Sequence, residues 1–351
     1  MTDDREYVAE LFRLQAEYCE KLGSPLYEGL LTRAADDIQA GGVTWGVLEA
    51  HQQDAPNTML HLRLLGAAHR LVLAGEATSL ARFYPSAGGR PDGDGAWSAF
   101  RELLGEQPDR IREELLAPVQ TNEVGRCMGL IGAFLEVARR TALPLRVLEV
   151  GASAGLNLRF DRYFYSDSGL GSSFGPAHST VRFADFVEEG RPPLDVETRV
   201  VERAGCDANP LQPQHAGDRL LLKSFVWPDQ AQRFEALSAA LDLARSEPLA
   251  VERADAGAWA ERQLADPRPG VATVLFHSLV MMYLGDETRE RLTGALERAG
   301  RMATDDAPFA WLGMELGGDE ADVHLTIWPG GEKRLVAKAG YHGRPVRWLG
   351  G

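Results

Sequence analysis

The chain has 351 residues, of which 44% are hydrophobic and 25% are charged. These proportions are ordinary for a globular protein with a large core, so neither a metal nor disulfides are needed to hold the fold. The formal net charge of −14 and the lack of a basic stripe exclude a partner bound mainly through its phosphate backbone, so we expect no nucleic-acid partner.

The cysteines and the apolar runs indicate the cellular compartment in which the protein functions. Cys19, Cys127 and Cys206 are widely spaced and form no CxxC pair, a pattern typical of reduced thiols in the cytoplasm. The charged start of the chain resembles no signal peptide. The longest apolar run, Val271–Leu284, is shorter than the roughly 20 residues that cross a bilayer, so we expect a core segment and no membrane partner.

The first part of the chain has a helical pattern. Apolar residues recur at three-to-four spacing, and Gly23-Ser24 and Gly41-Gly42 interrupt the pattern cleanly. The spacing predicts helices at Tyr7–Leu22, Pro25–Ala40, Thr58–Ala74 and Thr121–Arg140. We therefore expect a helical N-terminal domain over residues 1–140.

After Pro144, apolar strands alternate with helical stretches, which is typical of a mainly parallel α/β sheet. The predicted strands are Leu145–Val150, Thr198–Cys206, Leu249–Arg253, Val271–Phe276 and Phe309–Leu316, with helices at Asp229–Arg245 and Glu287–Ala299. Val323–Trp328 and Lys333–Ala339 form a predicted hairpin. We expect a Rossmann-like domain over residues 141–351, with a Gly/Ser/Pro-rich insertion at about 164–197 that carries one short strand, Thr180–Phe186.

The strongest local motif is Leu145–Leu158, an apolar strand followed by a glycine loop and a predicted helix start near Leu156. Gly151 permits a sharp turn, Ala152 and Ser153 let a ligand approach the backbone, and Gly155 allows close packing. The acidic Glu149 at the end of the strand suits a cationic group. The pattern E-x-G-x-S-x-G resembles the first motif of class I S-adenosylmethionine (SAM)-dependent methyltransferases, with Ser153 in place of the middle glycine.

That resemblance implies SAM as cofactor and assigns roles along the sheet. Glu149 would meet the methionine ammonium, and the glycine loop with Asn157 would line the cofactor. Asp207, with Asn209, resembles the acid after the second strand that bonds the ribose hydroxyls, although it lies much further from the loop than usual. Asp255 and Ala256 resemble the acid-small pair that faces the adenine.

Other polar residues are candidates for catalysis or for binding a small-molecule substrate. His277 ends a central strand and is either a base, a substrate contact or a hydrogen-bonded core histidine. Trp227 and Asp229 are further catalytic candidates. The substrate-binding candidates are Asn122, Glu123, Arg126 and Gln230. Helix capping is the alternative role for Asn122 and Asp229, and no histidine or cysteine spacing predicts a metal site.

The chain as a whole also resembles a bacterial family known as domain of unknown function 2332. Five strings carry this resemblance: Gln120–Arg126, Glu149–Tyr163, Gly205–Leu211, Val226–Gln230 and Phe276–Leu284. No activity follows from this family, so it leaves the methyl acceptor and the oligomeric state open.

Other functions compete with methyl transfer. Gly151–Gly155 is also a G-x-S-x-G nucleophile elbow, which predicts an α/β-hydrolase with Ser153 as nucleophile. Its acid would be Asp255 or Asp319, and its histidine His324 or His342. The helical N-terminal region and the lack of an HGGG-like segment disfavour this function. A non-catalytic Rossmann-like protein that binds a ligand or a partner, or a nicotinamide-binding protein, remains the other alternative.

Overall fold

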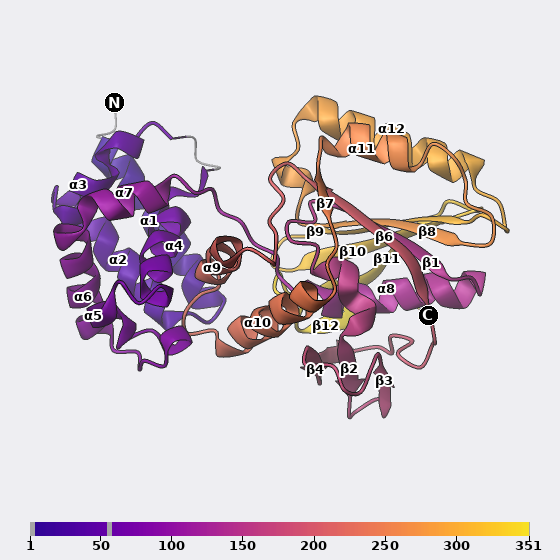
Figure 1. Cartoon of the computed structure of the whole chain (residues 1–351), viewed down its shortest axis with the longest axis horizontal. Helices are drawn as coiled ribbons and strands as arrows, with labels where there is room; N and C mark the ends of the chain where they lie inside the picture. The colour runs from indigo at the N-terminus through magenta and orange to yellow at the C-terminus, as the bar shows by residue number, and fades with distance from the viewer. Residues whose placement is uncertain (1–3, 55–57, 351) are drawn as a thin grey trace. The chain divides into compact units, whose positions relative to one another are not determined.

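The computed structural model describes residues 4–54 and 58–350, and Figure 1 shows its elements. The chain divides into two compact units. The helical unit comprises residues up to Thr121 together with His215–Ser238, and the sheet unit comprises Asn122–Gln214 and Ala239–Gly351. The sequence predicted a boundary near residue 140. The helix before the first strand groups with the sheet unit instead, because its apolar residues pack on the sheet.

The helical unit confirms the predicted helices Tyr7–Leu22, Pro25–Ala40 and Thr58–Ala74 within a few residues at each end. Its core is built around residues such as Phe12, Leu30, Leu64 and Phe100. The elements are α1 (Asp4–Lys21), α2 (Pro25–Gln39), α3 (Val43–Leu48), η1 (Glu49–His51), α4 (Leu60–Leu73), α5 (Thr78–Ala81), η3 (Pro85–Ala87), α6 (Gly93–Glu106), α7 (Pro108–Leu115), α9 (Ala216–Ser224) and the first half of α10 (Ala231–Ser246).

The sheet unit is a mixed α/β structure around a large, mostly parallel sheet of nine strands, in the order β5-β12-β11-β10-β9-β8-β1-β6-β7. The strands are β1 (Leu145–Val150), β5 (Val187–Glu189), β6 (Val200–Asp207), β7 (Val251–Arg253), β8 (Ala272–Ser278), β9 (Phe309–Leu316), β10 (Ala321–Trp328), β11 (Lys333–Ala339) and β12 (Val346–Trp348). The strands β7, β6, β1, β8 and β9 are mutually parallel, and β10, β11 and β12 continue as an antiparallel meander. The predicted hairpin is therefore confirmed.

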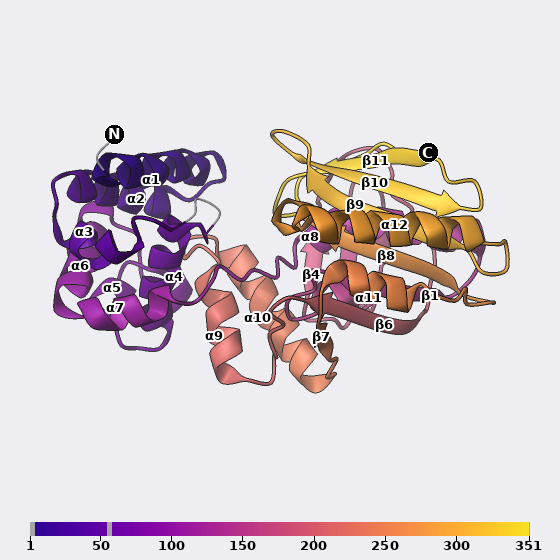
Figure 2. The same cartoon turned by 90° about the horizontal axis from the view of Figure 1, so that it is seen from above.

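The sheet is covered on both faces, as Figure 2 shows for α11 (Ala256–Gln263) and α12 (Asp286–Met302) on one of them. On the other face α8 (Arg126–Thr141) contacts strands from β8 to β12. The central strands β1 and β8 are buried at every residue, as expected for parallel strands between two helical layers. No helix in the described ranges is long and apolar enough to cross a membrane.

Between β1 and β6 the chain differs from the prediction. The helix expected from Leu156 is replaced by a short 3-10 helix, η4 (Asn157–Arg162). The Tyr163 hydroxyl donates to the Leu156 carbonyl at 2.6 Å, and the chain then turns into a small separate sheet. That sheet consists of β2 (Phe164–Asp167), β3 (Ser172–Phe174) and β4 (Arg182–Ala184), so the insertion carries more strands than the one predicted.

Candidate functional site

The glycine loop lies where the order of the parallel strands reverses. Numbered along the chain, these strands stand in the order 3-2-1-4-5, so β1 and β8 flank the reversal. In open α/β sheets, ligands bind outside the carboxyl ends of the strands at this point. Gly151, Ser153 and Gly155 have φ values of 72°, 51° and 67°. A serine in the left-handed region is strained, so surrounding contacts must hold this turn.

The backbone N–H groups of the loop donate inside the protein. Gly151 and Ala152 donate to the Cys206 carbonyl, and the Ser153 N–H donates to Asp207 Oδ2 at 2.9 Å. Asn122 Oδ1 accepts from the next turn, from Ala154 at 3.2 Å and Leu156 at 3.0 Å. Asn122, a predicted substrate contact, thus holds the glycine loop and does not cap α8.

The two other candidates beside Asn122 also lie at this carboxyl edge. The Glu123 carboxylate accepts from the Gly125 N–H at 3.1 Å. The Arg126 guanidinium donates to the Ser278 carbonyl at 3.1 Å and to the Tyr341 carbonyl at 3.3 Å. The predicted substrate residues 122, 123 and 126 therefore connect the start of α8 to the loop and to the end of β8.

Glu149 is the most unusual residue of the site. It is 1% exposed, and its Oε2 has no hydrogen-bond partner among the described residues. Burial raises the pKa of this carboxyl well above its usual range, and the nearby Asp207 raises it further. Arg126, a hydrogen bond from Asn157 and Arg159 lower the pKa, but by less than burial raises it. A buried carboxyl oxygen that lacks a donor is a place where a ligand donor or a proton is favoured.

Residues that the sequence did not single out surround Glu149. The Cys127 thiol donates to Asn157 Oδ1 at 3.4 Å, and burial raises its pKa well above the usual range. Tyr165 is fully buried beside Cys127. Cys127 follows Arg126 directly, and Tyr165 comes two residues after the Glu149–Tyr163 string. Only their position next to those motifs pointed toward the site.

The second acidic residue, Asp207, binds backbone on both of its oxygens. Besides Ser153, its carboxylate accepts from the Asn209 N–H at 2.8 Å. Arg253 in turn donates to Asn209 Oδ1 at 3.0 Å. Asp207 therefore joins the ends of β1 and β6, and each carboxylate oxygen keeps a second lone pair for a ligand hydroxyl.

Asp255 and Ala256 open helix α11. Asp255 is its N-cap and accepts from the Ala258 N–H at 2.9 Å, and it also binds Thr288 of α12. These contacts lower the pKa of its carboxyl, with the hydrogen bond from Thr288 as the largest cause. Its position is thus explained by capping and by joining α11 to α12.

His277, which is buried, forms a hydrogen-bond chain across β8 and β9. The Trp311 Nε1–H donates to His277 Nε2 at 2.9 Å, which leaves the proton on Nδ1 for Glu315 at 2.6 Å. Glu315 Oε1 also accepts from the Val280 N–H at 3.1 Å. Of the predicted roles, the hydrogen-bonded core histidine describes His277, and its effect is to orient Glu315 and the Val280 segment.

Val280 lies against the glycine loop. A Cβ added to Gly151 would be 2.2 Å from Val280 Cγ2, so the segment after β8 packs directly on the turn. The next residues, Met282 and Tyr283, are 53% and 62% exposed. Glu315 therefore secures a short segment whose Val280 packs on the loop and whose next side chains face outward.

The remaining candidates, Trp227, Asp229 and Gln230, belong to the helical unit. Trp227 is in its core, 6.3 Å from the Tyr27 ring. Asp229 accepts from the Ser24 hydroxyl at 2.6 Å and the Leu26 N–H at 3.0 Å, so it stabilises the start of α2 and not of its own helix. Gln230 donates to the Leu22 carbonyl at 2.8 Å.

The hydrolase alternative finds no assembled triad in the described part of the chain. Asp255 binds the groups named above, none of them a histidine, and Asp319 forms no hydrogen bond or ion pair there. His324 lies within β10 near Lys333, Asp322 and Lys338. Over the described residues, no group of three or more His, Cys, Asp and Glu side chains is arranged to hold a metal ion.

Comparison with known proteins identifies a family. No curated protein and no solved structure matches the chain significantly. A family model described as an uncharacterized protein conserved in bacteria, domain of unknown function 2332, matches residues 9–348. The match covers nearly the whole chain, so this protein belongs to the domain of unknown function 2332 family.

Proposed function

We propose that this chain is a SAM-dependent methyltransferase-like protein that acts on a small molecule, with a Rossmann-like sheet that binds SAM at the carboxyl ends of β1, β6 and β8. The observation that carries the proposal is Glu149, a buried carboxyl with an unpartnered oxygen beside the glycine loop. Its place next to the reversal of strand order is where such sheets bind ligands. A location in the cytoplasm is part of the proposal and is supported by three free, buried cysteines.

The residues present fit the parts of SAM. Glu149 accepts a hydrogen bond from the methionine ammonium, which supplies the donor that Oε2 lacks and favours the charged carboxylate. Asp207 accepts from the ribose hydroxyls with its remaining lone pairs, while it keeps its bonds to Ser153 and Asn209. Bound SAM supplies an electrophilic methyl group.

Access to Glu149 requires a local movement. Val280 packs on Gly151, and the Glu315 carboxylate accepts a hydrogen bond from the Val280 N–H. In the proposal, the Leu279–Tyr283 segment moves off the loop when SAM binds, and the exposed Met282 and Tyr283 then face the acceptor. His277 is a positioning residue in this scheme because it orients Glu315. Little acid-base chemistry is needed once a reactive acceptor is positioned.

Isothermal titration calorimetry with SAM and its demethylated product tests the proposal. We expect binding by the wild type and a loss of about ten- to a hundredfold in affinity in Glu149→Ala and Asp207→Ala, the effect of one charge-assisted hydrogen bond. Saturating SAM should also raise the melting midpoint by several degrees, since it stabilises by about 2.7 kcal/mol at a hundred times its Kd.

Two matched variants locate the binding site. Asp255→Ala removes another carboxylate, the one that caps α11, so it should lower stability by about 1 kcal/mol and leave the SAM affinity unchanged. Ser153→Ala should also keep SAM binding, since the Ser153 contact to Asp207 uses the backbone. Wild-type protein that binds neither SAM nor its product, or Ser153-dependent labelling by a fluorophosphonate, would overturn the proposal.

A further inference from the structure

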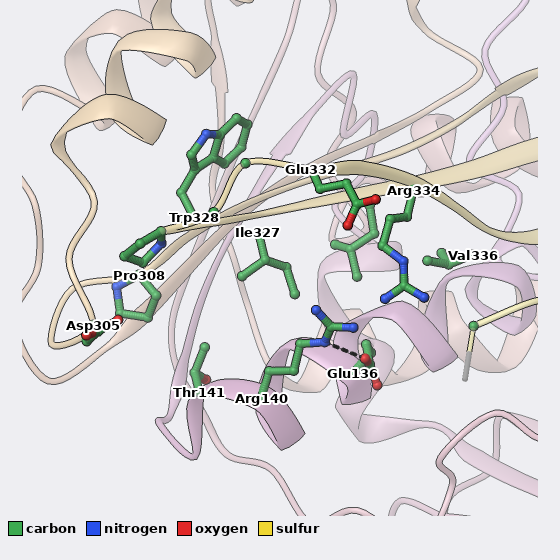
Figure 3. Close-up of a pocket in the computed structure, with 15 residues that line it drawn as sticks. Glu136, Arg140, Thr141, Asp305, Pro308, Ile327, Trp328, Glu332, Arg334 and Val336 are labelled. Atoms are coloured by element: carbon green, nitrogen blue, oxygen red, sulfur yellow. Dashed lines mark hydrogen bonds and ion pairs between the residues drawn. The ribbon is translucent and has the colours of Figure 1, made fainter.

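A pocket of about 460 Å³ lies at the edge of the sheet opposite the glycine loop (Figure 3). Its lining includes Thr141 and Pro308, which precede β1 and β9, so it is at the amino ends of the parallel strands. The pocket lies between the C-terminal part of α8 on one side and the β10–β11 pair on the other. Alternation along these strands turns Ile327 and Arg334 into the pocket.

Two arginines, Arg140 and Arg334, and two glutamates, Glu136 and Glu332, line one end of the pocket (Figure 3). Arg140 and Arg139 both bind the single carboxylate of Glu136, at 2.6 and 2.7 Å. Arg334 is partly buried in the pocket, yet it has no ion pair or hydrogen bond within the described residues. Figure 3 shows the guanidinium groups of Arg140 and Arg334 pointing into the space between α8 and β11.

The other end of the pocket is mostly apolar. Pro308 and Ile327 line it, as Figure 3 shows, whereas the Trp328 indole points to the opposite face of the sheet, where it packs on Phe309 and on Gly300 of α12. Asp305 also lies at this end, whereas Glu332 lies beside Arg334, is exposed, and forms no ion pair with it within the described residues. A guanidinium that forms no ion pair, next to an apolar wall, suits a ligand with an anionic head and an apolar body.

We propose that this pocket binds an organic anion, with its carboxylate or phosphate held by Arg334 and Arg140 and its apolar body against Ile327 and Pro308. The site is separate from the glycine loop and does not depend on SAM binding. Arg334 is the residue that confers the preference for an anion, because Arg140 already shares a carboxylate.

The fluorescent apolar anion 8-anilinonaphthalene-1-sulfonate is the probe. We expect one saturable site on the wild-type chain and an affinity about ten- to a hundredfold lower in Arg334→Gln, with Arg334→Lys in between. Lys333→Gln is the matched control: it removes the neighbouring cation, which is exposed and does not line the pocket, and the affinity should stay within twofold. Circular dichroism confirms that each variant is folded.

Competition identifies the anionic head group. Octanoate and octyl phosphate should displace the dye, and the stronger competitor shows whether a carboxylate or a phosphate is preferred. SAM should leave the dye bound. Equal dye binding by wild type and Arg334→Gln, an equal loss in Lys333→Gln, displacement by SAM, or displacement by inorganic phosphate at the same concentrations as octyl phosphate would each overturn the proposal.

Discussion

Two buried glutamates near opposite edges of the same sheet have opposite surroundings. Glu136, on α8 near the amino edge, is 5% exposed and forms ion pairs with Arg139 and Arg140. Glu149, at the carboxyl end of β1, is 1% exposed, and its Oε2 has no partner among the described residues. The Glu136 carboxylate is thus paired within the protein, whereas one oxygen of the Glu149 carboxyl has no hydrogen-bond partner among the described residues.

The two edges of the sheet differ in the kind of hydrogen-bond partner that each lacks. At the carboxyl edge, Oε2 of Glu149 lacks a donor among the described residues, which suits a cationic ligand group. At the amino edge Glu136 is satisfied and Arg334 lacks an acceptor, which suits an anion. Buried or partly buried polar groups are costly when they are left unpaired, so each unpaired group marks a place for a ligand.

The largest expected effect concerns the packing at the carboxyl edge. Gly151→Ala should lower the free energy of unfolding by about 2–5 kcal/mol, because its φ of 72° strains any L-residue and its Cβ would meet Val280. Gly171→Ala is the control, with a φ of 63° and open space around it, and should cost only about 1–2 kcal/mol. Equal losses in urea unfolding would show that Val280 does not press on the loop.

The next effect is the pH dependence caused by Glu149. Its folded pKa is raised above its usual value of 4.5, so the stability that the protonated form contributes is complete below about pH 4.5 and is lost as the pH rises through the folded pKa. Wild-type stability should therefore fall relative to Glu149→Gln as pH rises, by at most about 1.4 kcal/mol per pH unit. Urea unfolding between pH 5 and pH 8, at about one-unit steps, measures this.

Glu136→Gln is the matched control for that experiment. Glu136→Gln removes the ion-paired glutamate. The difference in pH dependence between wild type and Glu149→Gln should therefore persist when Glu136→Gln is introduced into both proteins. A pH dependence that disappears with Glu136→Gln instead would contradict its assignment to Glu149.

The smallest expected effect is the stability of Glu136→Gln itself. Its two arginine partners are about half exposed, and such pairs contribute about 1 kcal/mol or less. The loss of stability should stay below about 1 kcal/mol and shrink at high salt. The same change releases Arg140, so the affinity for 8-anilinonaphthalene-1-sulfonate should rise. A loss of several kcal/mol, or weaker dye binding, would contradict the roles given to the two edges.

Much of the fold could be predicted from local patterns. The apolar runs of β1, β9 and β11 predicted those strands with the correct bounds, and three-to-four spacing predicted α1, α2 and α4 within a few residues. The prediction of a helix after the glycine loop was wrong, because Tyr163 binds the Leu156 carbonyl and the chain turns into a second sheet. That contact depends on a residue seven positions away, and periodicity does not reveal it.

The candidate site divides in the same way. Glu149, Gly151 and Asp207 were placed at strand ends by the sequence alone, because a strand followed by a turn shows in local composition. Only the tertiary structure showed that Asn122 holds the loop, that Asp229 stabilises α2, and that His277 is bonded on both nitrogens. Arg334 and Arg140 are far apart in the chain, and no motif connects them. The sequence determined which elements form and in what order, through local periodicity and turn chemistry. Which polar groups are paired and which are left for a ligand was decided by long-range packing, because a hydrogen bond depends on atoms that only the folded chain brings together.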